Sequence, residues 1–387
     1  VRTARENEQC IRCDSSRRPA GAREILSGET LAVEWPASVL TQLSSVYGAE
    51  RVRQAQLRIP SVRWEVSPST RQEPSRQVST GAGDVIPGTL LHSGEVTQSA
   101  VDASLPGRGI PVAFERTYRN QTIGPGPLGP GWDHSYRMRL RVLPNGDVDL
   151  YDGRGRRDVF RSEAAGTLKA PPGWFAELKR LSSGFELTLT DHSAIRFDAH
   201  GRMVSLRDRL KIADDAGNEL RFRHDASDRL IAIDDDLGQV HRLTYDAEGR
   251  LTRFTDATGR EWKYVYNLAG LLETVTTPAL TVGESIFPSG LETRSEYSVS
   301  TGTLAEKLAA RDDLRSITDP RGLKPVEWDY SDADGDGRAE EVTTERWGGK
   351  ALGIVYRFAE GETETTDRVG ATRVYGHDSS GRLLRAV

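Results

Sequence analysis

The sequence is poor in cysteine, in long hydrophobic runs and in excess positive charge. Its 387 residues contain two cysteines, Cys10 and Cys13, in the stretch CIRC. One CxxC pair cannot complete a zinc site of four cysteines, or of two cysteines and two histidines. We interpret this pair as an exposed remnant of a cut domain. Half a metal site and a local disulfide are the alternatives.

The same shortages argue against a membrane span and a nucleic-acid partner. No stretch approaches 18 consecutive apolar residues, the length that a membrane-spanning helix requires. A formal net charge of −5 and an isoelectric point near 5.9 argue against bulk attraction to nucleic acid. The opening VRTARENEQC has no Met and no apolar core. We therefore see no signal peptide in this chain and expect a piece of a longer protein.

Catalytic and nucleotide-binding motifs are missing as well. The sequence has no GxSxG elbow, no P-loop, no kinase motif set and no HExxH. GPGPLG (124–129) matches GxGxxG, but Pro125 and Pro127 remove amide donors that would hold phosphate. We interpret it as a rigid loop closed by inward packing of Trp132. We predict that the chain is not an enzyme. Self-proteolysis is the one enzymatic alternative, and no acidic pair is located for it.

Composition divides the chain into an N-terminal part and a long β-rich part. We expect residues 1–66 to be partly helical, because 36–55 has helical spacing of apolar residues. Residues 67–84 are rich in Ser, Pro, Gln and Gly, which is typical of a linker. From residue 85 onward, short alternating runs such as FELTLT are separated by turns such as PNGD, which predicts an all-β architecture. One helical interruption is expected at 303–314.

A 21-residue period is the strongest pattern in the sequence. Three sets of landmarks recur at this spacing: Gly217, Gly238 and Gly259; His224, Tyr245 and Tyr266; Arg229-Leu230, Arg250-Leu251 and Leu271-Leu272. Asp and Gly favour the turns, while runs such as LTRFTD and EWKYVY alternate apolar and polar residues, as strands with one buried face do. A two-stranded hairpin is barely stable alone, so we expect stacked copies to bury each other's faces.

The pattern Y-D-x-x-G-R-L followed by T-D-x-x-G-R-x-x-x-Y-x-Y resembles the YD repeats of Rhs (rearrangement hotspot) proteins, which include polymorphic toxins. The same repeats occur in component C of insecticidal toxin complexes and in teneurins. A stretch upstream, from GDVIPG (83–88) to GWDHSYRMRL (131–140), is similar to the domain that precedes the repeats in Rhs cores. The resemblance implies an all-β fold, an antiparallel YD-repeat hairpin array forming part of a spiralling β-shell. A β domain would occupy 85–200, and truncated repeats would occupy 201–387.

The resemblance also implies a kind of function. In this family YD repeats build a hollow β-shell that can enclose a C-terminal toxin domain, or an extracellular adhesion scaffold. We expect a non-enzymatic structural segment of a secreted or surface bacterial protein, which encloses or presents a toxin or effector polypeptide. Its partners would be the missing C-terminal shell and toxin domain of the same polypeptide. The alternative is a scaffold that binds carbohydrate on cell surfaces. Exposed Trp262, Tyr264 and Trp328 would support that alternative, and their burial would count against it.

The stretch DADGDGRAEE (332–341) carries the clearest metal-binding signal. The candidate ligands are Asp332, Asp334, Asp336 and Glu340. Alternate carboxylates on a tight turn converge on one hard cation, as in calcium loops. The EF-hand pattern is incomplete at Thr343, so Glu340 is expected to supply the missing carboxylate. We expect a structural Ca²⁺ here. The alternative is an ordinary repeat turn lengthened by a few residues.

The remaining histidines and the C-terminal end have structural interpretations. His224 and His377 occupy the aromatic position of the repeat and His134 lies in GWDHSY, so we expect all three to pack rather than to bind metal. A repeat array cut within a unit exposes its last strand. We therefore predict a free sheet edge near Val387, with poor solubility or dimerisation as its consequence.

Overall fold

The chain divides into two units in a computed structural model. The described residues are 23–27, 30–34, 88–105, 110–121, 125–163, 166–171, 174–208, 218–282, 285–298, 313–335, 339–378 and 381–387. One unit comprises Val1–Val66 and Leu280–Pro288, and the other comprises Ser67–Ala279 and Ser289–Val387. In the first unit β1 (Arg23–Ser27) pairs with β2 (Thr30–Glu34), and β23 (Leu280–Val282) pairs with β24 (Ser285–Phe287). The helix predicted at 36–55, the linker at 67–84 and the two cysteines lie outside the described residues.

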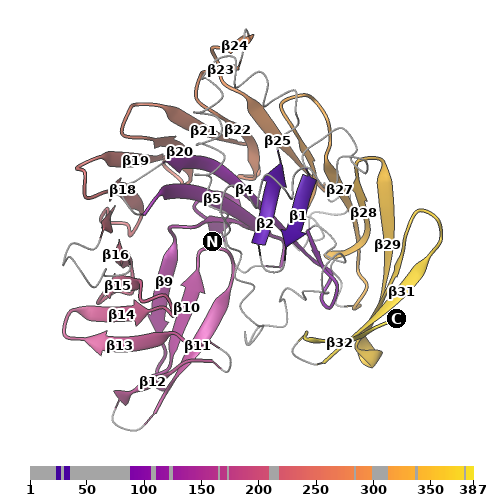
Figure 1. The fold of residues 1–387 in the computed structure, drawn as a ribbon, viewed down its shortest axis with the longest axis horizontal. Helices are drawn as coiled ribbons and strands as arrows, with labels where there is room; N and C mark the ends of the chain where they lie inside the picture. Colours follow the sequence, from indigo (N-terminus) through magenta and orange to yellow (C-terminus); the bar gives the residue numbers. More distant parts are fainter. Residues whose placement is uncertain are drawn as a thin grey trace. The chain divides into compact units, whose positions relative to one another are not determined.

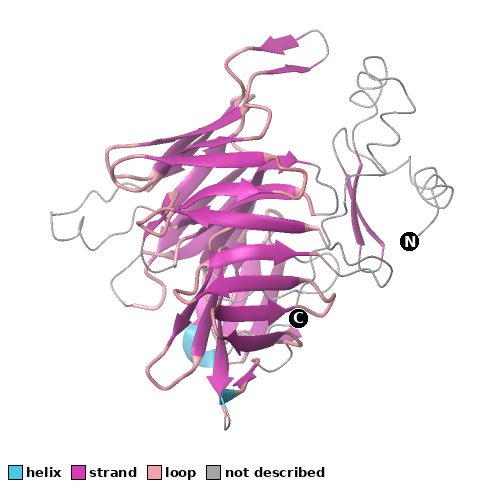
Figure 2. Ribbon diagram, turned by 90° about the vertical axis from the view of Figure 1, so that its left-hand side faces the viewer, coloured by secondary structure: helices cyan, strands magenta, loops and turns pink. Residues whose placement is uncertain are grey.

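The second unit is built on one 18-stranded antiparallel sheet. Its strands follow one another in chain order, with only the β23–β24 hairpin left out, and curve into an open arc (Figure 1). Figure 2 shows the strands lying one beside the next. The strands are β13 (Glu177–Leu181), β14 (Gly184–Thr188), β15 (Ala194–Asp198), β16 (Met203–Arg207), β17 (Glu219–His224), β18 (Leu230–Asp234), β19 (Val240–Tyr245), β20 (Leu251–Thr255), β21 (Glu261–Tyr266), β22 (Leu272–Thr276), β25 (Glu292–Tyr297), β26 (Leu314–Thr318), β27 (Val326–Ser331), β28 (Glu341–Trp347), β29 (Lys350–Arg357), β30 (Glu362–Thr366), β31 (Thr372–His377) and β32 (Leu383–Ala386).

The 21-residue period corresponds to a pair of strands. β17, β19 and β21 start 21 residues apart and have the same order of buried and exposed positions, with the second and fourth residues buried. The fourth residues of these strands are Phe222, Leu243 and Tyr264, and all three are buried. Each repeat therefore presents one apolar face to a shared core, as the alternation predicts. The all-β prediction is confirmed, and the described residues contain no α-helix, only the 3₁₀ turn η3 (Phe358–Glu360).

A β-bulge recurs at the aromatic position of most repeats, although not at Tyr356. The register shifts between Arg223 and His224, and again at Tyr245 and Tyr266, each 21 residues further on. The same shift returns just before Tyr297, Tyr330 and His377. A bulge adds one residue to a strand and increases its local twist. Bulges that recur at this position are a physical cause for the curvature of the sheet.

A four-stranded sheet covers the concave side of the arc (Figure 1). It consists of β3 (Thr89–Leu90), β4 (Glu95–Leu105), β5 (Val112–Arg119) and β8 (Trp132–His134). The Phe114 ring stacks on Phe254 of the large sheet with 4.9 Å between ring centroids. Trp132 is 1% exposed and its Nε1 donates to the Tyr297 hydroxyl at 2.9 Å, which confirms the predicted inward packing of this tryptophan.

A second four-stranded sheet lies next to the start of the large one (Figure 1). It consists of β9 (Met138–Val142), β10 (Val148–Asp152), β11 (Arg157–Ser162) and β12 (Leu168–Lys169). The Leu140 amide donates to the Gly201 carbonyl at 2.8 Å, and this bond ties β9 to the turn between β15 and β16. The short strands β6 (Pro125–Gly126) and β7 (Gly129–Pro130) pair within the predicted rigid loop.

The last described strand of the large sheet is β32, and the predicted association through this edge stays a prediction. β32 pairs with β31 only, and Leu384 and Val387 are 62% and 72% exposed. The helix predicted at 303–314 falls largely outside the described residues, and β26 begins at Leu314. The domain limits at 84 and 200 stay predictions. Among the described residues, no helix is both long and apolar enough to cross a membrane.

Candidate functional site

The D-x-x-G-R turn has the same geometry in several repeats of the chain. Asp246 Oδ1 accepts the backbone N–H of Arg250 at 2.8 Å, while its Oδ2 accepts the Arg250 Nε–H at 2.7 Å. Gly249 closes the turn at φ +83°, a conformation that L side chains rarely adopt. The same double contact joins Asp198 with Arg202 and Asp225 with Arg229. The turn residues are therefore engaged in structure.

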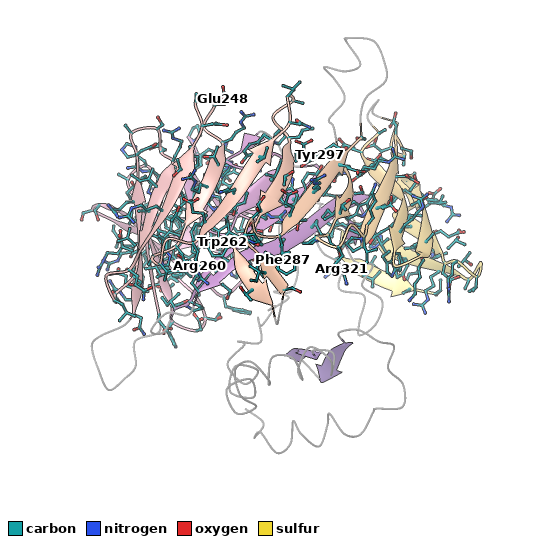
Figure 3. All side chains as sticks on the ribbon, turned by 90° about the horizontal axis from the view of Figure 1, so that it is seen from above. Glu248, Arg260, Trp262, Phe287, Tyr297 and Arg321 are labelled. Carbon is teal, nitrogen blue, oxygen red and sulfur yellow. The ribbon has the colours of Figure 1, made fainter. Side chains whose placement is uncertain are left out.

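The tyrosine of each repeat fastens it to the preceding hairpin. The Tyr266 hydroxyl donates to the Leu251 carbonyl at 2.6 Å, and the guanidinium of Arg250 lies 4.9 Å from the Tyr266 ring centroid. Burial raises the pKa of Tyr266, so this hydroxyl stays protonated as a donor. Equivalent hydroxyl bonds are made by Tyr245, Tyr297, Tyr330 and Tyr356. Figure 3 shows Tyr297 toward the same edge of the sheet as Glu248, opposite Arg260 and Arg321.

The three histidines singled out in the sequence are packed. His134 is 1% exposed, and burial lowers its pKa to about 3. His377 is buried and His224 is half-buried, and burial lowers the pKa of both. A neutral buried imidazole at the aromatic position is a packing residue. The predicted structural role is confirmed for His134 and His377.

The aromatic side chains considered for carbohydrate binding are in the core. Trp262 is 6% exposed, Tyr264 is 2% exposed and Trp328 is fully buried. Tyr264 also donates its hydroxyl to Asp102 Oδ2 at 3.0 Å. A sugar-binding platform needs an accessible aromatic face, so these three residues give that alternative no support.

The acidic loop brings together a different set of carboxylates from the predicted one. Ligand atoms of Asp332, Asp334 and Glu341 lie within 4.8 Å of one another. Glu340 is not in this group, and Asp336 lies outside the described residues. Glu341 is buried beneath Gly94, where an added Cβ would approach the Glu341 Cβ to 2.7 Å. Burial, followed by the charges of Asp334 and Glu340, raises the Glu341 pKa to about 7, although the Ala333 amide donates to its Oε2.

A second buried carboxyl lies on the same strand. Glu345 has no exposed surface, and its Oε2 accepts the Thr89 hydroxyl at 2.5 Å. Trp328 is its cross-strand neighbour. Among the described residues no cation lies within ion-pair distance of Glu345, and burial raises its pKa to about 7. No local sequence pattern points to Glu345, because its partner Thr89 lies 256 positions away. Here a carboxyl holds the β3–β4 hairpin against β28.

A groove of about 560 Å³ lies beside the repeat turns. Its walls come from loop 126–130, from β9 and from successive repeat turns, so it combines parts of the chain that precede and include the repeats. Arginines dominate its charged lining, including Arg137, Arg139 and Arg202. It holds no nucleophile paired with a base, and we assign it no catalytic role.

These features define a protein class: a β-hairpin repeat protein in which tyrosine hydroxyl bonds fasten hairpins to the preceding ones and Asp–Arg ion pairs hold the turns. Residues 245–282 match the family model for the RHS Repeat, and residues 91–160 match the Domain of unknown function (DUF6531). The probable deoxyribonuclease RhsA of Dickeya dadantii (strain 3937) is 43% identical over 56 residues, which cover 14% of this chain and 4% of that protein. These matches confirm the resemblance to Rhs/YD-repeat proteins over the residues that they cover.

Similar solved structures include a crystal structure of TcdB2-TccC3, with TM-score 0.24 and 10% identity, over 76% of this chain and 19% of that one. Another is a crystal structure of TcdB2-TccC3-TEV, with TM-score 0.30 and 11% identity, over 88% of this chain and 20% of that one. A third is the N-terminal domain of effector protein SpvB from Salmonella typhimurium strain LT2. It has TM-score 0.13 and 15% identity, over 74% of this chain and 98% of that one. These scores are too low to bear on function. The RHS Repeat match and the curved antiparallel sheet agree on a β-hairpin repeat architecture of the Rhs type.

Proposed function

We propose that this chain is a non-enzymatic wall segment of a β-shell that encloses or presents a toxin or effector polypeptide. The single observation that carries the proposal is the open 18-stranded arc, whose concave side is covered by β4 and β5 and whose last strand is a free edge. A curved antiparallel sheet with a free edge is extended by further strands of the same kind. Those strands would come from the remaining shell of the same polypeptide.

The chemistry of the described residues supports a structural role. Turn aspartates and arginines pair with each other, and the repeat tyrosines donate to backbone carbonyls. The relative in Dickeya dadantii is named a probable deoxyribonuclease, but its match covers 4% of that protein. We propose that any such activity belongs to another part of the parent polypeptide. Export from a bacterial cell, or display on its surface, belongs to the same proposal.

The decisive experiment is solution scattering on this chain extended by the next few hundred residues of its parent gene. The proposal predicts a hollow particle with a low-density centre. A solid or extended particle would overturn it. A matched assay with linear DNA and Mg²⁺ should show no cleavage by this chain alone. Carbohydrate binding is not retained as a second function, because the aromatics that would support it are buried.

A further inference from the structure

The groove described above runs along the turn edge of the large sheet. One wall is formed by the turns around Arg202, Arg229 and Arg250, and the other by loop 126–130 and β9 with its flanking Arg137. The two walls meet where the Leu140 amide donates to the Gly201 carbonyl. A cavity of about 560 Å³ lies in the size range of ligand sites.

The wall made by the repeat turns is balanced in charge. Arg202 contacts Asp198 and Asp228, each at 2.6 Å. Arg229 pairs with Asp225 at 2.7 Å, and Arg250 does the same with its own turn aspartate. Each of these arginines is already committed to an acid of its repeat. They give the wall its shape but leave little charge for a ligand.

The opposite wall has more positive than negative charge. Arg137 Nη1 lies 3.0 Å from Asp133 Oδ2, and Arg139 Nη1 lies 4.0 Å from the same oxygen. Two guanidinium groups thus share one carboxylate, and neither has another ion pair within the described ranges. Arg139 lies 4.5 Å over the Tyr151 ring, a face contact that leaves the donors at its edge available.

Burial makes the negative charge of the shared Asp133 carboxylate less favourable. Burial raises the pKa of Asp133 to about 6, against the opposing effects of Arg137, the His134 amide and Arg139. Asp133 therefore loses part of its charge just below neutral pH. Burial first, and then the charge of Arg137, lowers the pKa of Arg139. The lowered pKa of Arg139 is the shift expected of a buried guanidinium beside a second cation.

We propose that this groove binds a carboxylate-bearing polypeptide segment, whose acidic side chain or C-terminal carboxylate pairs with Arg137 and Arg139. A planar guanidinium suits bidentate contact with a carboxylate. Gly249 lines the groove, and a Cβ at this position would have only the Arg229 Cδ within reach, at 3.9 Å. A peptide backbone can therefore approach this turn closely. This inference goes beyond the wall function and does not depend on the shell being closed.

Calorimetric titration of this chain with hexaglutamate and hexaglutamine peptides tests the proposal. Hexaglutamate should bind at one site, and hexaglutamine should not. Arg139→Gln should weaken binding roughly ten- to a hundredfold, the range for one lost charge-assisted hydrogen bond. The control Arg294→Gln removes an exposed arginine of β25 that pairs with Glu292 outside the groove, and it should leave the affinity unchanged. Asp133→Asn removes the competing acid and should tighten binding.

Three results would overturn the proposal. One is that neither peptide binds. Another is that Arg139→Gln and Arg294→Gln weaken hexaglutamate binding equally, which would show a diffuse charge effect. The third is that inorganic phosphate competes at the concentration of the peptide, which would identify a small-anion site instead. Thermal melting of each variant establishes that it is folded before titration. If Arg139→Gln does not fold, the opposite effect expected of Asp133→Asn still decides.

Discussion

Asp246 shows how one side chain can hold a whole repeat turn. Its two oxygens accept the backbone N–H and the guanidinium Nε–H of Arg250. Asn267 occupies the equivalent position in the next repeat and accepts the amides of Ala269 and Leu271 at 3.0 and 3.1 Å without an ion pair. The backbone contacts are therefore common to both residue types, and the ion pair is an addition. Exposed ion pairs contribute little, so the backbone contacts should matter more.

We predict that Asp246→Ala lowers the free energy of unfolding by about 1–2 kcal/mol, because turn amides lose their acceptor. Asp246→Asn keeps that acceptor, as Asn267 does, and should cost less than about 1 kcal/mol. Urea unfolding of both variants, followed by tryptophan fluorescence, measures the difference. Equal losses in the two variants would mean that the ion pair, and not the backbone contact, holds the turn.

At the scale of elements, hydrogen bonds join the β3–β4 hairpin to β28, and one of them is made by a buried carboxyl group. Thr89 bonds Glu345, and the Val342 amide donates to the Gly94 carbonyl at 3.0 Å. Thr363 of β30 donates to the Leu91 carbonyl at 2.5 Å. Glu345 faces the Thr89 hydroxyl and the Trp328 indole, while Tyr330 and Tyr356 lie close enough for its charge to raise their pKa values. This contact is where the covering sheet meets the later repeats.

The contact should weaken as pH rises. The folded pKa of Glu345 is about 7, above the ordinary 4.5, so the folded state holds a proton that the unfolded chain releases between these values. Stability is therefore highest below about pH 4.5 for this group and falls by roughly 1.4 kcal/mol per pH unit as pH rises to 7. Glu345→Gln should reduce this slope, measured by urea unfolding from pH 5 to 8. Exposed Glu292→Gln is the control, and a slope shared by wild type and Glu345→Gln would contradict the assignment.

The acidic loop gives a separate prediction at this scale. If Asp332, Asp334 and Glu341 hold a cation, millimolar Ca²⁺ should raise the melting temperature of the chain, because a ligand that binds only the folded state stabilises it. Glu341→Gln should abolish that increase, whereas Asp319→Asn, in an exposed turn, should keep it. An equal increase with Mg²⁺, or one that survives in Glu341→Gln, would place the effect elsewhere.

Sequence patterns predict the local elements here and miss the contacts between distant ones. The 21-residue period gave the hairpins and their buried faces, because both depend on neighbouring residues. The sequence pattern favoured Glu340, and only the fold brings a carboxylate oxygen of Glu341, buried beneath Gly94, within 4.8 Å of those of Asp332 and Asp334. Asp133, whose carboxylate Arg137 and Arg139 share, lies close to both in the sequence. Only the fold shows the groove that the two arginines line. The alternation of apolar and polar residues also does not show where a bulge interrupts a strand.

At the scale of the whole molecule, the free edge decides how this chain behaves in solution. β32 presents one unpaired side, and Leu384 and Val387 are largely exposed there. An edge strand with unpaired backbone groups and apolar side chains is a template for pairing with another chain. Alone, this chain should associate through that edge.

Leu384→Lys should therefore shift the chain toward monomer, since an inward or edge lysine opposes strand pairing. The control is Val369→Lys, which adds the same charge at a turn residue that is 77% exposed and away from the edge. Sedimentation velocity across a hundredfold range of concentration distinguishes the two. If both variants associate like the wild type, another surface mediates association. If the wild type is itself a stable monomer at every concentration, the edge is protected, and the open-array view of this segment is wrong.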